Sequence, residues 1–127
     1  MTSLDGLQKA LLCTRAALDR KAIDLVVVDV GALTSITDYL VICTGRSDRQ
    51  VQSIAQAIEE TLEAQGIRPI SIEGMRRGHW ALLDYGDVVV HVFYQPVREF
   101  YDLERLWEHA PRVQLPEPLL SQALAGR

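Results

Sequence analysis

The segment from Thr44 to Gln50 has the position of a phosphate-binding loop but not its composition. It follows an apolar run typical of a strand and precedes a helical pattern, and the N-terminus of such a helix binds phosphate in many nucleotide-binding proteins. It lacks the glycines and the lysine of a P-loop. Ser47 and Gln50 instead have the spacing of an N-terminal capping box. The pattern therefore favours a turn and a capped helix over a phosphate site.

The histidines and cysteines show no spacing typical of a metal site or of nucleophilic catalysis. His79 and His91 point to opposite faces of a predicted hairpin, so they cannot bind one ion together. Cys13 and Cys43 each lie in an apolar run, which indicates buried, reduced thiols in a cytosolic protein. No Ser-His-Asp or Cys-His arrangement can be assigned from the spacing. We therefore expect no metal, no cofactor and no catalytic residue.

A tight β-hairpin around Gly86 carries the most informative side chains. Gly86 supplies the positive φ that a short turn requires. For a loop of two or four residues, Leu82 pairs with Val89 and Trp80 pairs with His91. Because side chains alternate along a strand, one face has the composition of a core: Ala81, Leu83, Val88, Val90 and Val92. The other face carries Trp80, Leu82, Val89, His91 and Phe93, with Asp84 and Asp87 at the turn.

The second hairpin face has two interpretations. An aromatic face with a histidine and an acidic rim fits a surface that binds a partner. His91 would titrate near neutrality if Asp84 were close, but the two lie about two side-chain rows apart in this pairing. A polar contact at an interface is therefore favoured over a general base. In the alternative interpretation a helix covers this face and His91 is hydrogen-bonded beneath it.

The remaining periodicity predicts one sheet, in the element order α-β-β-α-β-β-β-α. We expect a first helix that Ser3 caps and that runs to about Lys21, with an apolar stripe of Leu4, Leu7, Leu11 and Leu18. A second helix opens at Ser47 and ends at Gly66, and a third spans about 100–108, with Leu103, Leu106 and Trp107 to bury. The expected strands are 24–30, 39–44, 68–73 and the hairpin pair, and Pro69 suggests a sheet edge. This is an α/β protein of the α+β type, with a single mixed five-stranded sheet and helices mainly on one face.

Length and composition indicate one domain with its own core. The chain has 127 residues, of which 48% are hydrophobic. We assign residues 1–113 to the domain and 114–127 to a C-terminal tail that either adds a weak helix or stays mobile. The formal charge of −4 gives no global field that favours nucleic acid. No apolar stretch has the length of a membrane span and no export signal is evident, so we expect a cytoplasmic protein.

Six pieces of the chain together form a specific set: Asp38-Tyr39 through Gln50, Glu73-Gly74, Gly78 with Trp80, Asp84 through Asp87, His91 with Phe93, and Phe100 through Trp107. This set resembles the ribosomal silencing factor family, also called RsfS or Iojap. The resemblance spans about Lys21 to Val113, which is most of the chain. It implies a nucleotidyltransferase-like scaffold, and a protein that binds the large ribosomal subunit and obstructs subunit joining.

The resemblance also implies a partner and a mechanism. The expected partner is ribosomal protein fourteen, at the face of the large subunit that the small subunit must approach. The obstruction is steric and lowers translation, for example in nutrient-poor growth. An acidic factor and a basic ribosomal protein have complementary charges, which speed encounter. We expect Trp80, His91 and Phe93 as anchors, an acidic rim of Asp84, Asp87, Glu99 and Glu104, and further contacts from Tyr85 and Tyr101.

Three questions stay open at the level of sequence. Arg76 and Arg77 form either a solvated loop or a peripheral contact with ribosomal RNA. The alternative function is a nucleotide- or RNA-modifying enzyme, because Gly45-Arg46-Ser47 stands at a helix start as in nucleotidyltransferases. The next strand offers only Glu73, however, so the paired carboxylates of a two-metal site are incomplete and the scaffold would lack its chemistry. A homodimer through an exposed sheet face is a third interpretation, and it can coexist with ribosome binding.

Overall fold

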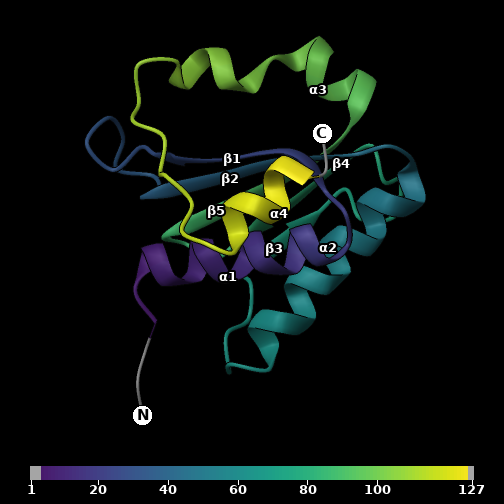
Figure 1. Cartoon of the computed structure of the whole chain (residues 1–127), viewed down its shortest axis with the longest axis horizontal. Helices are drawn as coiled ribbons and strands as arrows, with labels where there is room; N and C mark the ends of the chain where they lie inside the picture. The colour runs from purple at the N-terminus through teal and green to yellow at the C-terminus, as the bar shows by residue number, and fades with distance from the viewer. Residues whose placement is uncertain (1–3, 126–127) are drawn as a thin grey trace.

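The computed structural model describes residues 4–125, which form one five-stranded sheet with helices on both sides (Figure 1). The elements follow the predicted order, with a 3-10 helix, η1, and a terminal helix added. In chain order they are α1 (Gly6–Asp19), β1 (Ile23–Asp29), β2 (Tyr39–Gly45), α2 (Asp48–Glu63), β3 (Ser71–Glu73), β4 (Trp80–Asp84), β5 (Val88–Tyr94), α3 (Gln95–Tyr101), η1 (Leu103–Trp107) and α4 (Leu119–Ala125).

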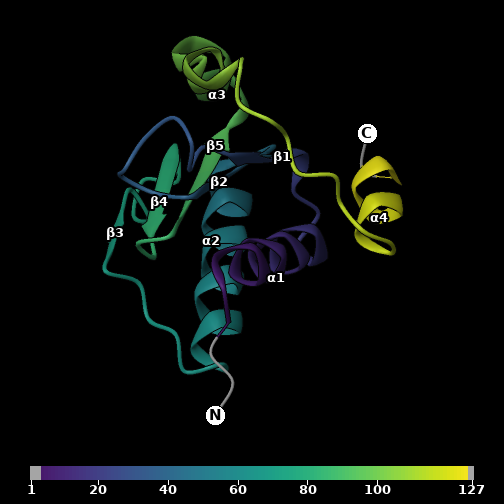
Figure 2. The same cartoon turned by 90° about the vertical axis from the view of Figure 1, so that its left-hand side faces the viewer.

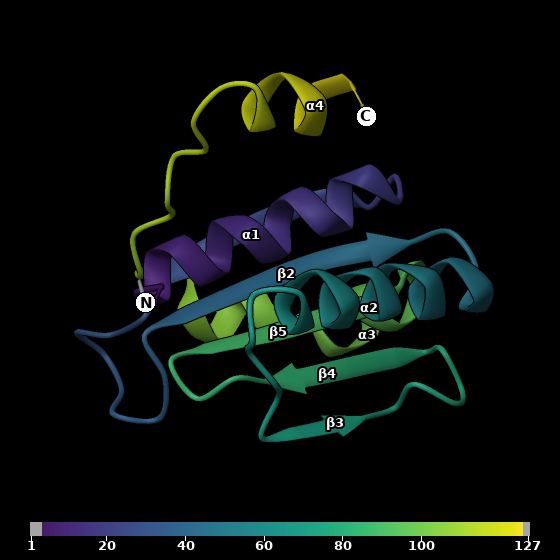
Figure 3. The ribbon, with the colours of Figure 1, turned by 90° about the horizontal axis from the view of Figure 1, so that it is seen from below.

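The sheet has the strand order β1-β2-β5-β4-β3, and its β2–β5 pair is parallel while the other pairs are antiparallel. Figure 3 shows β2, β5, β4 and β3 following one another across the sheet. This confirms the predicted single mixed five-stranded sheet. The short strand β3 lies at one edge, where Pro69 just before it has no N–H to donate. The other edge, β1, is covered by the chain after η1, because Asp29 N donates to Pro111 O at 2.9 Å and Val113 N donates to Val27 O at 2.8 Å.

The two long helices, α1 and α2, pack on one face of the sheet (Figure 2). Ser47 caps α2 by accepting from Gln50 N at 3.1 Å. The Gln50 side chain does not return this bond but accepts from Arg46 N at 2.6 Å, so half of the predicted capping box forms. Gly66 follows α2 with φ +77°, as predicted. The shared core lies between these helices and the sheet: Val41, Val51, Ile54, Ile58, Leu62, Leu83, Val90 and Val92 are buried there.

Helix α1 differs from its predicted cap and buried face. Asp5 is the N-cap, where Asp5 Oδ1 accepts from Gln8 N at 2.8 Å and Gln8 Oε1 accepts from Asp5 N at 2.9 Å. The predicted cap, Ser3, lies outside the described residues. The leucine stripe is wrong in part, because Leu7 is exposed while Leu18 is buried. Small residues make most of the buried face and allow close packing: Ala10, Cys13, Thr14, Ala16 and Ala17.

The opposite face of the sheet is covered by α3 and η1 (Figures 1 and 2). The helix begins at Gln95 rather than at Phe100 and breaks at Asp102, which has a left-handed φ of +47°. The side chains that pack this segment onto the sheet are Val97, Leu103 and Trp107. The structure thus matches the alternative interpretation of the hairpin, in which a helical segment covers the second face.

The C-terminal segment adds the helix α4, which lies against the outer side of α1 (Figure 3). Leu119 is its buried residue. A hollow of about 630 Å³ remains between α1 and this segment, lined by Leu4, Leu11, Leu12, Pro118 and Leu119 among others. The domain boundary at residue 113 stays a prediction. None of the helices within residues 4–125 is long and apolar enough to cross a membrane.

Candidate functional site

The β4–β5 hairpin has the predicted faces but not the predicted pairing. Trp80 is paired with Phe93 and Leu82 with His91, so the register is shifted by two residues. The turn is closed by a hydrogen bond from Tyr85 N to Val88 O at 2.9 Å, which places Gly86 and Asp87 at its centre. Because a shift of two residues preserves the alternation of side chains, the core face is unchanged.

Trp80 is the centre of an aromatic cluster on the second hairpin face. Its ring centroid lies 4.8 Å from that of Phe93 and 4.9 Å from that of Tyr101. Trp80 Nε1 donates a hydrogen bond to His91 Nδ1 at 3.0 Å. Burial lowers the pKa of His91 from 6.5 to about 4, which agrees with the expectation that His91 makes a polar contact rather than acting as a general base. His91 is neutral at pH 7 and accepts this hydrogen bond.

The four aromatic residues differ greatly in exposure. Phe93 is 0% and His91 is 7% exposed, whereas Trp80 is half-buried and Tyr101 is 55% exposed. Two of the three predicted anchors, His91 and Phe93, therefore lie beneath the surface. A partner that meets this region reaches Tyr101 and the accessible part of Trp80, while His91 and Phe93 support them from below.

The α3–η1 segment presents two large apolar side chains that the sequence did not single out as site residues. Phe100 is 81% exposed and Leu106 is 75% exposed. Leu103, Leu106 and Trp107 were predicted to be buried, but the break at Asp102 changes the helical phase, and only Leu103 and Trp107 of the three pack inward. Phe100 lies edge-on to Tyr101, with ring centroids 5.1 Å apart. We define the α3–η1 surface as Trp80, Phe100, Tyr101 and Leu106.

Acidic side chains accompany this surface. Glu99 is exposed on α3, and its place on an acidic rim stays a prediction. Glu104 is half-buried and accepts a hydrogen bond from Arg98 Nε at 2.8 Å, and this bond holds the pKa of Glu104 below its usual value. Residues 95–110 contain four carboxylates and two arginines, so the segment is acidic.

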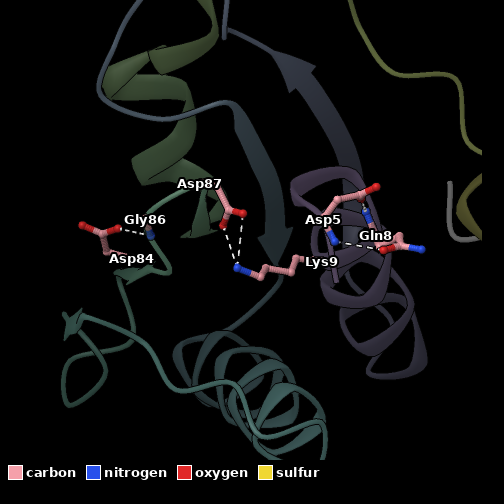
Figure 4. A network of polar contacts seen from close by, with 6 residues as sticks. All are labelled: Asp5, Gln8, Lys9, Asp84, Gly86 and Asp87. Carbon is pink, nitrogen blue, oxygen red and sulfur yellow. Dashed lines mark hydrogen bonds and ion pairs between the residues drawn. The ribbon is translucent and has the colours of Figure 1, made fainter. Parts of the chain in front are cut away.

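The predicted acidic residues of the hairpin turn lie elsewhere, at the opposite end of β4 from Trp80. The separation is roughly 13 Å along the strand at about 3.3 Å per residue. Asp87 binds Lys9 of α1 at 3.0 Å, and Asp84 Oδ1 accepts from Gly86 N at 2.8 Å (Figure 4). Both carboxylates therefore stabilise the turn and its contact with α1.

Tyr85 does not accompany the aromatic cluster. Its side chain is 6% exposed and belongs to the core on the α1 and α2 face. Its hydroxyl is buried without a hydrogen-bond partner, and burial raises its pKa. Tyr85 is therefore placed away from the α3–η1 surface, contrary to the prediction that it joins the contact.

Arg76 and Arg77 are exposed on the loop between β3 and β4. The loop is held in place, because Gln52 Nε2 donates to Arg76 O at 2.8 Å. Gly74 has φ +80°, and any side chain there would collide with the carbonyl oxygen of Trp80. Arg77 also lines a hollow of about 270 Å³ together with Trp80 and Tyr101. The basic loop thus borders the α3–η1 surface.

The remaining candidates for chemistry are two cysteines and one glutamate. Burial raises the pKa of both Cys13 and Cys43 to about 12, so neither thiol is reactive. Glu73 is exposed on the edge strand β3. Within residues 4–125 no group of three or more His, Cys, Asp or Glu side chains is arranged to hold a metal ion.

The fold and this surface define the class of protein: a small α+β protein with an exposed apolar and acidic patch, of the kind that binds other macromolecules. Comparison with known proteins specifies the family. Residues 4–126 match the family model described as "Ribosomal silencing factor during starvation". Ribosomal silencing factor RsfS of Bacillus subtilis is 42% identical over 110 residues, which cover 85% of this chain and 93% of that protein. The chain belongs to the ribosomal silencing factor (RsfS) family.

Organellar relatives and solved structures agree with this assignment. The chloroplastic protein Iojap of Zea mays is 34% identical over 107 residues, which cover 84% of this chain and 46% of that longer protein. A crystal structure of a Chromobacterium violaceum protein is similar with a TM-score of 0.81 and 35% identity, over 90% of this chain and 92% of that one. A Bacillus halodurans structure has a TM-score of 0.74 and 39% identity, over 82% and 94% of the two chains.

Proposed function

We propose that this protein binds the large ribosomal subunit through ribosomal protein fourteen and sterically blocks joining of the small subunit. Membership of the ribosomal silencing factor family supports a role in repressing translation. A mouse relative, 32% identical over 87 residues, is named for mitochondrial assembly of the ribosomal large subunit, which supports the choice of subunit. The action requires no chemical step, and it takes place in the cytoplasm with the ribosomes.

The α3–η1 surface is the observation that carries this proposal. Phe100, Tyr101 and Leu106 are 81%, 55% and 75% exposed, and apolar area of this kind is costly to leave in water. Aromatic side chains at the centre of an interface contribute much of the binding free energy. The acidic segment around these side chains has a charge complementary to that of a basic ribosomal protein.

The residues predicted from the sequence take different parts in this proposal. Trp80 and Tyr101 contact the partner directly, and the buried His91 and Phe93 fix the position of Trp80. Glu99 and Glu104 form the acidic rim. Asp84 and Asp87 lie at the far end of the hairpin. They contact only the edge of the partner, where its interface extends along the hairpin to the turn. Arg76 and Arg77 contact ribosomal RNA beside that protein.

Cosedimentation with purified large and small subunits, tested separately, examines the proposal. The wild-type protein should pellet with the large subunit alone. A Phe100→Ser/Leu106→Ser variant should lose this binding and keep its melting temperature, since both side chains are exposed. The matched control is Leu33→Ser/Ile36→Ser, which changes two side chains that are 57% and 83% exposed in the loop between β1 and β2. If both double variants bind the large subunit as tightly as the wild type does, the α3–η1 surface does not contact that subunit.

The order of addition tests the steric mechanism. Added before magnesium-driven association, the protein should keep the subunits apart in sucrose gradients in proportion to its occupancy of the large subunit. Added afterwards, it should act only as fast as ribosomes dissociate spontaneously, because the docking face is then covered. Faster splitting of preformed ribosomes would contradict passive obstruction. No nucleotide should be required in either order.

A further inference from the structure

Arg98 connects the α3–η1 segment to the sheet at several points. Its Nη1 donates to the backbone oxygen of Asp24 at 2.6 Å and to the hydroxyl of Thr44 at 2.7 Å. Its Nε donates to Glu104 at 2.8 Å. One side chain of α3 thereby joins β1, β2 and η1. The side chain is only 12% exposed, so these bonds are made largely out of water, where charge-assisted hydrogen bonds are strong.

The apolar attachment of the same segment is weak by comparison. No side chain of α3 or of η1 is fully buried, and Val97, Leu103 and Trp107 are only partly so. Between the two elements Asp102 adopts a left-handed backbone, with φ +47° and ψ 49°, a conformation that aspartate adopts more readily than most residues other than glycine. The orientation of α3 and η1 on the sheet therefore depends on polar contacts more than that of α1 or α2 does.

The Thr44 hydroxyl also gains a role from this contact. Thr44 is 1% exposed at the end of β2, in the segment whose sequence suggested a phosphate loop. Arg98 lies 54 residues further along the chain. A valine at position 44 would have nearly the same shape but would offer the guanidinium no acceptor, and a buried unpaired donor is costly.

We propose that Arg98 and Thr44 are positioning residues for ribosome binding, which hold the α3–η1 surface in the orientation that the partner recognises. This inference rests on the proposed function, because the orientation matters only if that surface binds. A guanidinium is needed, since it is planar and donates in several fixed directions at once, whereas a lysine ammonium is a single point charge on a flexible stem. Preorganising a contact surface improves affinity because less ordering remains to be done on binding.

Two conservative variants with matched controls test the inference. Arg98→Lys keeps the charge, and Thr44→Val keeps the shape. The control for the first is Arg20→Lys, since Arg20 bonds Ser53 at 3.1 Å away from α3. The control for the second is Thr14→Val, since Thr14 is equally buried but bonds Ala10 O of its own helix at 2.9 Å. The readouts are affinity for purified large subunits, amide hydrogen exchange over residues 95–107, and melting temperature.

We expect both variants to bind large subunits about tenfold more weakly, as a loosened contact surface would. Exchange over residues 95–107 should accelerate, while the amides of α1, α2 and β5 stay as protected as in the wild type. The two controls should match the wild type in affinity and in exchange of that segment. A general loss of stability would instead accelerate exchange everywhere, and it would appear in Thr14→Val as well.

The outcomes separate this inference from the proposed function. If the wild type binds large subunits and both Thr44→Val and Arg98→Lys bind equally well, the positioning role is overturned. The proposed function would then still stand. If Arg98→Lys does not fold, Thr44→Val decides alone. Absence of wild-type binding to large subunits would overturn the proposed function, and hydrogen exchange would still decide whether Arg98 holds the segment on the sheet.

Discussion

Trp80 Nε1 donates to His91 Nδ1 at 3.0 Å, although the residue paired with Trp80 across the ladder is Phe93. The bond therefore runs diagonally across the hairpin. It requires a neutral His91 with an unprotonated Nδ1, and the lowered pKa of His91 maintains that state at pH 7. Proton binding at His91 would remove the acceptor and loosen the support of Trp80.

Stability should fall on acidification through His91. In the folded state its pKa is about 4, against an ordinary value of 6.5, so below pH 6.5 the unfolded chain binds the proton more readily. The contribution is fully present above pH 6.5 and is lost as the pH falls through 4, a change of about 3 kcal/mol in the free energy of unfolding. Denaturation at pH 7, 5.5 and 4 measures it.

His91→Asn is the matched variant for this titration. Its amide oxygen is an acceptor but does not titrate. Between pH 7 and pH 4 the free energy of unfolding should fall less for the variant than for the wild type, because only the wild type also loses the contribution of His91. Parallel curves for the two proteins would contradict a buried, neutral His91.

Trp80→Ala should weaken binding to the large subunit by about 2 kcal/mol or more, as for a central aromatic anchor. The fold should persist, because Trp80 is half-buried and the core on the α1 and α2 face is untouched. Circular dichroism and cosedimentation should be measured on the same preparation. If the variant is unfolded, Trp80 is needed for the fold, and the result does not support a direct contact between Trp80 and the partner.

Tyr85→Phe should stabilise the protein by about 1 kcal/mol, because it removes a buried hydroxyl that lacks a partner. Binding to the large subunit should not change, since Tyr85 lies on the face of α1 and α2. Tyr101→Phe is the control, with little expected effect on stability at an exposed position. Urea denaturation of the three proteins compares them. A clear destabilisation by Tyr85→Phe would indicate that the hydroxyl is bonded.

Charge reversal should slow association only where the carboxylates face the partner. Glu104 is paired with Arg98, so the variant reverses two exposed carboxylates of the same segment, Glu99 and Glu108. Glu99→Lys with Glu108→Lys should lower the association rate with isolated ribosomal protein fourteen at low salt, and less at physiological salt, where screening acts over about 8 Å. Asp87→Lys should instead lower the melting temperature, since it places two lysines together at the Lys9 contact. An association rate unchanged by the Glu99/Glu108 reversal at low salt would argue against an acidic rim on this segment.

Some features of the site follow from local pattern alone. The alternation of Ala81, Leu83, Val90 and Val92 assigned them to the core, and the structure confirms it. The register was wrong by two residues, because both pairings put the same side chains on the same faces, and alternation cannot distinguish between them. The hydrogen bond between Tyr85 and Val88 that closes the turn decides the pairing.

The site itself depended on contacts between distant parts of the chain. The exposure of Leu106 follows from the break at Asp102, which helical periodicity does not foresee. The burial of Phe93 follows from the return of α3 and η1 over the sheet, where Arg98 donates a hydrogen bond to Thr44.

The sequence by itself determined the sheet, the order of its elements, the hairpin with its two faces, and the family. The sheet, the order of its elements and the hairpin depend on periodicity and turn chemistry, which act between residues a few positions apart, whereas the family was indicated by the resemblance of six motifs. Only the tertiary structure decided which aromatic side chains remain accessible, that Asp87 binds Lys9, and that Tyr85 points into the core. Those outcomes depend on how segments far apart in the chain compete for the same surface, and no local pattern records that competition.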